Sequence, residues 1–166
     1  KKLNFKAFGL AGFATCLLAM AGAASAGSIV YSLDSTEVTQ YGTGPDGTVT
    51  LTESGTAIDF NITLRSDLNF VNTGNHSVFS FNANGVATTD ISNIAFNGVA
   101  NSNYTVVAPG TNPPFGNGTF TLMIDCTVAA NCSNGSPGQQ VDPLTFSVAN
   151  AALTDFGFLG TSPNVT

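Results

Sequence analysis

The sequence has little charge, a single histidine and no tryptophan. Only 8% of the 166 residues are Asp, Glu, Lys or Arg. The histidine, His76, stands beside Asn75, and no motif of the Ser/His/Asp or Cys/His type includes it. A catalytic site needs a nucleophile, a base and a group that orients them, and no stretch supplies all three. We therefore expect a non-enzymatic protein with no catalytic residues, and we interpret His76 as a loop residue.

The ten acidic residues are scattered, so they identify no pair of carboxylates for glycoside hydrolysis. Calcium is the inorganic ligand that they could hold, because Asp, Asn and loop carbonyls supply hard oxygens. No Asp-x-Asp-x-Asp loop occurs, however. Asp46 and Asp142 fit turns, and Asp125 fits a strand end. We expect no cofactor and no metal site, with calcium kept as an alternative.

The absence of tryptophan also bears on carbohydrate binding, which commonly uses exposed aromatic platforms. Most phenylalanines occur in alternating runs, so we interpret them as core residues rather than as binding platforms. The candidates that combine a ring with a polar group are Tyr31, Tyr41 and Tyr104, and Tyr41 lies in a glycine-rich stretch that favours exposure.

The one long apolar run lies at the amino terminus. Three lysines within the first six residues precede an apolar segment over 8–20, and Ala24-Ser25-Ala26 follows as a small-residue cleavage site. The run is shorter than the roughly 20 residues of a spanning helix. We predict a secretory signal peptide, forming a helix, over residues 1–26, with cleavage by signal peptidase between Ala26 and Gly27. Residues 27–166 then form one domain, truncated at its carboxyl end, and the mature chain has no membrane span.

Removal of this segment changes the charge. The remainder keeps one cation, Arg65, against ten acidic residues, or a net charge of −9. Such a surface cannot neutralise a phosphate backbone, so nucleic acid is excluded as a partner. Anionic lipid is disfavoured for the same reason. Neutral polymers and divalent cations remain as partners.

Two cysteines, Cys126 and Cys132, remain after removal of the leader. An oxidising compartment allows them to pair. The five residues between them include Asn131, and the turn-forming run Ser-Asn-Gly-Ser-Pro-Gly follows Cys132, so the loop can close. A zinc site is the alternative, but two cysteines and one distant histidine are too few ligands. We predict a structural disulfide between Cys126 and Cys132.

Short alternating runs separated by Gly, Asn and Pro predict an all-β fold, an antiparallel sandwich or jelly roll. The expected strands cover 28–33, 48–53, 57–64, 77–81, 104–107, 118–126 and 144–148. The runs 48–53 and 57–64 predict a hairpin around Gly55. Residues 91–96 fit either a strand or a helical turn, because their apolar positions also follow helical spacing. The stretch 118–148 reads as a hairpin-like unit: a strand, a stapled loop and a returning strand.

Two segments carry a family resemblance. They are Phe120-Thr-Leu-Met-Ile-Asp-Cys-Thr, followed by Asn131-Cys-Ser-Asn-Gly, and Pro143-Leu-Thr-Phe-Ser-Val-Ala-Asn-Ala. With the leader and the Asn/Gly/Thr-rich body, they resemble the PEP-CTERM proteins of Gram-negative bacteria that make exopolysaccharide. The resemblance implies sorting by an exosortase through a carboxy-terminal tail, which lies outside this chain, and release to the surface or matrix.

Together these features predict a secreted or surface-exposed protein with a structural or adhesive role in the biofilm matrix. Its expected partners are extracellular polysaccharide or other surface proteins. The alternative is a carbohydrate- or calcium-binding sandwich module, and a secreted hydrolase ranks third.

Overall fold

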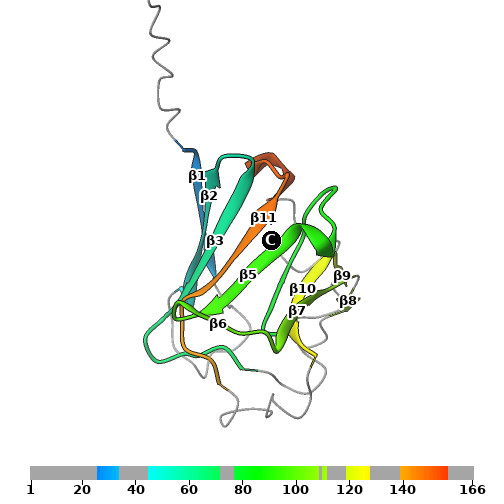
Figure 1. Ribbon diagram of the computed structural model, residues 1–166. Coiled ribbons are helices and arrows are strands. Elements are labelled where there is room, and N and C mark those ends of the chain that lie inside the picture. Colours follow the sequence, from blue (N-terminus) through cyan, green and yellow to red (C-terminus); the bar gives the residue numbers. More distant parts are fainter. Residues whose placement is uncertain are drawn as a thin grey trace, which may run out of the picture.

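The protein is an antiparallel β-sandwich, as the computed structural model in Figure 1 shows. The structure describes residues 26–33, 45–71, 77–108, 110–111, 119–127 and 139–156. In spatial order, the six-stranded sheet contains β1 (Ser28–Leu33), β2 (Gly47–Ser54), β3 (Ala57–Leu64), β11 (Leu144–Ala149), β5 (Ile91–Phe96) and β6 (Val99–Ala100). The three-stranded sheet contains β4 (Phe79–Phe81), β10 (Leu122–Cys126) and β7 (Tyr104–Val107). The predicted all-β sandwich is thereby confirmed.

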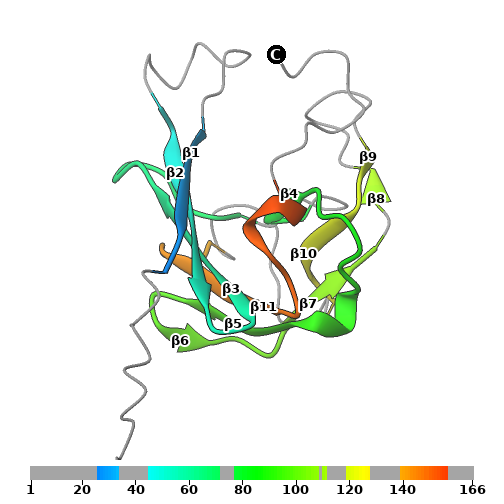
Figure 2. The ribbon, with the colours of Figure 1, turned by 90° about the horizontal axis from the view of Figure 1, so that it is seen from above.

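Three smaller elements complete the described chain. Strands β8 (Gly110–Thr111) and β9 (Thr119–Phe120) form a two-stranded ribbon. Two 3₁₀ turns, η2 (Thr88–Asp90) and η5 (Leu153–Asp155), precede β5 and follow β11 respectively. In the view of Figure 2, the six-stranded sheet curves around one side of the molecule and β4, β10 and β7 lie opposite it.

The predicted hairpin is present. Strands β2 and β3 pair antiparallel from Gly47↔Leu64 to Ser54↔Ala57, which leaves only Gly55 and Thr56 in the turn. Gly55 has φ +65°, a backbone conformation that glycine adopts without steric cost and that favours it at the first position of a two-residue turn. A second two-residue turn, Asn97-Gly98, joins β5 to β6 with both φ angles positive, as a type I′ turn requires.

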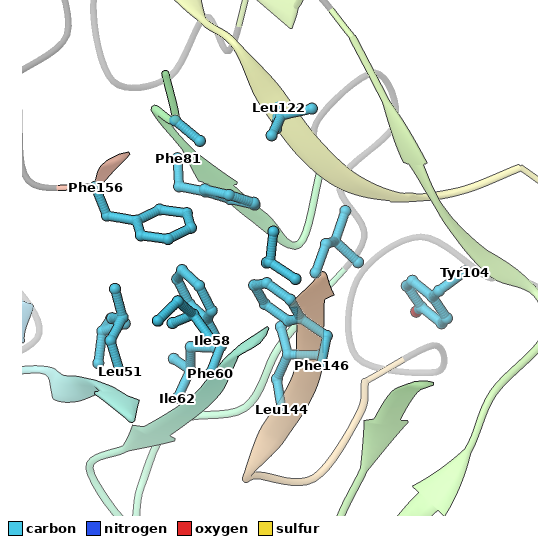
Figure 3. Close-up of a cluster of buried hydrophobic side chains, with 14 of the residues drawn as sticks. Leu51, Ile58, Phe60, Ile62, Phe81, Tyr104, Leu122, Leu144, Phe146 and Phe156 are labelled. Carbon is cyan, nitrogen blue, oxygen red and sulfur yellow. The ribbon is translucent and has the colours of Figure 1, made fainter. Parts of the chain in front are cut away.

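The core lies between the two sheets (Figure 3). Alternate residues of β3 and β11 point inward, so that Ile62, Leu144 and Val148 are completely buried. Phe60 stacks on Phe146 at 4.5 Å between ring centroids, and Phe81 of the small sheet lies 5.5 Å from Phe146. Aromatic pairs across the layers therefore join the sheets, and each such pair adds about 0.5–1.5 kcal/mol beyond the burial of its area.

The expected hairpin-like unit over 118–148 was wrong. Its first strand divides at Thr121, whose N–H donates to Asn82 Oδ1 (3.1 Å) and whose hydroxyl accepts from the Ala83 N–H (2.8 Å). The continuation, β10, pairs with β4 and β7. Strand β11 instead lies between β3 and β5 in the other sheet. The two strands are not each other's partners because both bury their apolar face in the same core from opposite sides.

Residues 91–96 form a strand, β5, and a β-bulge explains their helix-like spacing. Thr145 pairs with Ala95 and Ser147 with Ser92, so the single residue Phe146 opposes both Asn93 and Ile94. The extra residue restores Ile94 to the core side. Apolar positions three apart thus share a face here without a helix.

Candidate functional site

The outer face of the six-stranded sheet is lined with short polar side chains. The register aligns them in two rows across β2, β3 and β11. One row contains Thr50, Asn61 and Thr145, and the other contains Thr52, Asp59 and Ser147. Because side chains alternate along each strand, these residues point away from the core that their neighbours fill. The second row ends at Ser92 of β5.

A shallow hollow of about 440 Å³ lies on this face. Its polar lining consists of Thr52, Asp59, Asn61, Asn93, Thr145 and Ser147. These side chains offer hydroxyl, amide and carboxylate groups, and none of them is a cation. We call this hollow with its six polar residues the polar hollow.

Two hydrogen bonds within the face join four of its side chains. Ser147 Oγ donates to Asp59 Oδ1 at 2.6 Å across the β3–β11 pair. Thr63 Oγ1 donates to Asn61 Oδ1 at 3.2 Å, which occupies the amide oxygen. A ligand would therefore meet Asn61 chiefly through the donors of its amide nitrogen. The arrangement can offer both donors and acceptors to an uncharged polar ligand.

Asn93 owes its place in the polar hollow to the bulge of β5. It has φ +60°, in the left-handed region where asparagine is among the best tolerated non-glycine residues. The same residue also lines a second hollow of about 330 Å³, which Ile94, Asn101 and Tyr104 border from β5, the following turn and β7. Asn93 therefore lines both hollows.

Arg65 lies just after β3 and is paired with two carboxylates. Its Nε is 2.6 Å from Asp67 Oδ1 and its Nη1 is 3.1 Å from Asp46 Oδ1. The hydrogen bond with Asp67 raises the pKa of Arg65 and lowers the pKa of Asp67. Arg65 is the one Lys or Arg after residue 6 of the sequence, and both of its ion pairs are with carboxylates, so an anionic ligand would have to compete with Asp46 and Asp67 for it.

Tyr104 lies at the beginning of β7, opposite Cys126 of β10, and is 5% exposed. Burial raises the pKa of its phenol, and the nearby carboxylate of Asp125 raises it further. Its ring packs 4.8 Å from that of Phe96. Tyr104 is therefore a core residue, and the expectation that it could serve as an exposed aromatic platform was wrong.

The sequence-predicted site residues are dispersed. Ala26 is exposed and Gly27 lies beside β2, where its carbonyl accepts from the Glu53 N–H. Cys126 ends β10, whereas Cys132 lies outside the described residues, so their pairing stays a prediction. Tyr41 and His76 also lie outside the described residues.

The acidic residues considered for calcium do not come together. Asp46 is paired with Arg65, Asp125 belongs to β10, and Asp142 precedes a cis-proline. Within the described ranges, no three His, Cys, Asp or Glu side chains form a group that could hold a metal ion. The same part of the chain contains no helix long and apolar enough to cross a membrane.

The polar hollow was not predicted from the sequence. The alternation of β2 and β3 placed Asp59, Asn61 and Thr63 on the outer face, but nothing local indicated that β11 and β5 would lie beside them. The only signal near Asn93 was the apolar spacing of residues 91, 94 and 95. The bulge explains why 91 and 94 share a face, whereas Ala95 pairs with Thr145 of the outer face. No model of a protein family matches this chain, and neither a curated protein nor a solved structure matches it.

Proposed function

We propose that the protein is an exported, non-catalytic component of the cell surface or exopolysaccharide matrix of a Gram-negative bacterium, of the PEP-CTERM type. The observation that carries this proposal is the order of its parts: a leader ending in Ala24-Ser25-Ala26 directly precedes the first strand of an antiparallel sandwich. Export is the role of such a leader. The sandwich is a scaffold whose buried apolar residues form one core cluster.

The charge pattern supports an extracellular, structural role. Arg65 is held between Asp46 and Asp67, so the unpaired charges on the described surface are carboxylates. A uniformly acidic surface repels nucleic acid and anionic lipid but tolerates neutral polymers. Neutral segments of an exopolysaccharide are therefore the matrix component that this surface suits.

Cell fractionation tests the proposal. The full chain is expressed in a Gram-negative host, and its mass and location are determined in cytoplasm, envelope and medium. We expect a product shortened by the leader, in the envelope or the medium. A variant with Leu17→Arg and Leu18→Arg in the apolar run is the control and should stay in the cytoplasm at precursor mass. Retention of the unchanged chain in the cytoplasm would sink the proposal.

The second candidate function is binding of an uncharged saccharide, and the polar hollow favours it. Sugar hydroxyls both donate and accept hydrogen bonds, and the hollow offers hydroxyl, amide and carboxylate groups within one depression. The fixed Ser147–Asp59 pair reduces the ordering that binding would require. A saccharide-binding face would give a matrix protein its adhesive contact.

Affinity electrophoresis through gels that contain neutral polysaccharides tests this function. We expect one or more of dextran, a β-glucan and a galactomannan to retard the protein, and Asn61→Ala to reduce the retardation. Thr48→Ala is the matched control, because Thr48 lies on the same outer face but does not line the hollow. Retardation by anionic alginate alone would contradict a site for neutral sugars. A rise in melting temperature with calcium would instead favour a calcium module.

A further inference from the structure

Glu53 lies at the point where the leader is expected to be cut. Gly27 precedes β1 and continues its pairing with β2: the Glu53 N–H donates to the Gly27 carbonyl at 2.9 Å. In return, the Gly27 N–H donates to Glu53 Oε2, also at 2.9 Å. The backbone nitrogen that would become the new terminus is thus already within hydrogen-bond distance of a carboxylate.

We infer that cleavage creates an ion pair here, in which Glu53 captures the new amino terminus of the mature protein. Hydrolysis of the Ala26–Gly27 peptide bond adds water across it, leaving a carboxylate on Ala26 and an ammonium group on Gly27. The ammonium group carries a positive charge where the amide carried none, on the nitrogen that lies 2.9 Å from Glu53 Oε2 in the uncut chain. A hydrogen bond in which only the carboxylate acceptor is charged becomes an ion pair in which donor and acceptor are both charged, which is stronger.

The surroundings of Gly27 fit this role. A Cβ atom added to Gly27 would lie 2.8 Å from Glu53 Oε2 and 3.1 Å from Leu153 Cδ1. A side chain at this position would therefore displace the carboxylate or Leu153 of η5. Ala26 is exposed, so the peptide bond to be cut lies where the chain leaves the sheet. Glycine as the first mature residue allows the close approach of terminus and carboxylate.

The ion pair would anchor the amino-terminal end of β1 after the leader has been cleaved. Strand β1 is an edge strand that pairs only with β2 among the described strands. A charged terminus held by Glu53 fixes the free end of this edge, so the cut chain need not fray where it has lost its covalent continuation. The inference rests on the proposed export, because only an exported chain meets signal peptidase.

The sequence offers a specific probe for this terminus. All three lysines precede Gly27. After cleavage, residues 27–166 therefore contain one primary amine, the α-amino group of Gly27. The full chain is expressed with its leader, and the secreted product is sequenced from its amino terminus. Its rate of reaction with an amine-directed acetylating reagent is then measured by mass spectrometry across pH.

We expect a sequence beginning Gly27-Ser28 and an α-amino pKa about half a unit above the usual value near 7.7–8.0, or roughly threefold slower acetylation at neutral pH. Glu53→Gln keeps the shape, removes the charge and should restore the ordinary rate. Asp125→Asn, which removes a carboxylate from the opposite sheet, should leave the rate unchanged.

Equal rates in the unchanged chain and Glu53→Gln, or a terminus other than Gly27, would overturn the ion pair. In those cases the protein is still exported, whereas a failure of the proposed function leaves an uncut precursor in the cytoplasm.

Discussion

Single residues of this protein take unusual conformations or pKa values for reasons that can be traced to their neighbours. Asn93 has a left-handed backbone because the bulge of β5 needs one residue more than β11 supplies. Tyr104 has a raised pKa because its phenol is buried near a carboxylate. Each case gives a prediction that a substitution can test.

At Asn93 the expected effect depends on which residue can adopt a positive φ. Asn93→Gly should change the free energy of unfolding by no more than about 0.5 kcal/mol, because glycine takes this conformation freely. Asn93→Val should cost about 1–2 kcal/mol, because a branched side chain clashes there. Urea denaturation measures both. Thr50→Val, on extended backbone of the same face, is the control and should be nearly neutral. Equal losses for the glycine and valine variants would contradict a strained backbone.

Tyr104 should make the protein sensitive to alkali. Its pKa is raised above 10.0 in the folded state, so the folded chain holds the phenolic proton more tightly than the unfolded chain. The associated stability is complete below the unfolded pKa and is lost as pH rises through the folded value. Thermal melts across this range should show the loss, and Tyr104→Phe should remove it. An unchanged pH profile in Tyr104→Phe would show that another group is responsible.

At the scale of elements, most strands and the β2–β3 hairpin could be predicted, whereas the pairing of strands far apart in the sequence could not. The β2–β3 hairpin follows from two alternating runs around Gly55, and its second strand has the predicted bounds. Strand β11 was also predicted, but its place in the sheet between β3 and β5 was not. The Ser147–Asp59 bond joins residues 88 positions apart, and no local pattern specifies such a partner. The polar hollow depends on this pairing, so it could not be predicted from the sequence.

Strand β11 should be the element on which the fold depends most. Phe146 is 2% exposed and contacts the rings of Phe60, Phe79 and Phe81. Phe146→Ala should lower the free energy of unfolding by about 3–5 kcal/mol, because it leaves a cavity between the sheets. Denaturant titration measures the loss. The control, Val30→Ala, truncates a side chain that is 62% exposed on β1, and a comparable loss there would contradict a core centred on Phe146.

The whole molecule combines one core with a predicted covalent link. Short alternating runs without a long helical stripe predicted an all-β sandwich, and the two sheets confirm that fold class. The sequence did not indicate which strand belongs to which sheet, because the strands of both sheets show the same alternation of apolar and polar residues.

The disulfide between Cys126 and Cys132 is a prediction at this scale. Non-reducing mass spectrometry of exported protein should find the two residues joined. Reduction should lower the free energy of unfolding by about 2.4 kcal/mol in the chain-entropy description of so short a loop. Two free thiols in the exported protein would refute the link, and a Cys126→Ser variant provides the reduced reference.

The pairing of Arg65 with Asp46 and Asp67 has a consequence for cleavage by trypsin-like proteases. Residues 27–166 contain no lysine and no other arginine, so trypsin-like proteases have a single bond to cut, between Arg65 and Ser66. Such enzymes bind the basic side chain in a deep pocket, and to enter it Arg65 would have to leave both carboxylates. Arg65 is therefore the one residue within 27–166 that these enzymes recognise, and its two carboxylate partners compete with the enzyme pocket for its side chain.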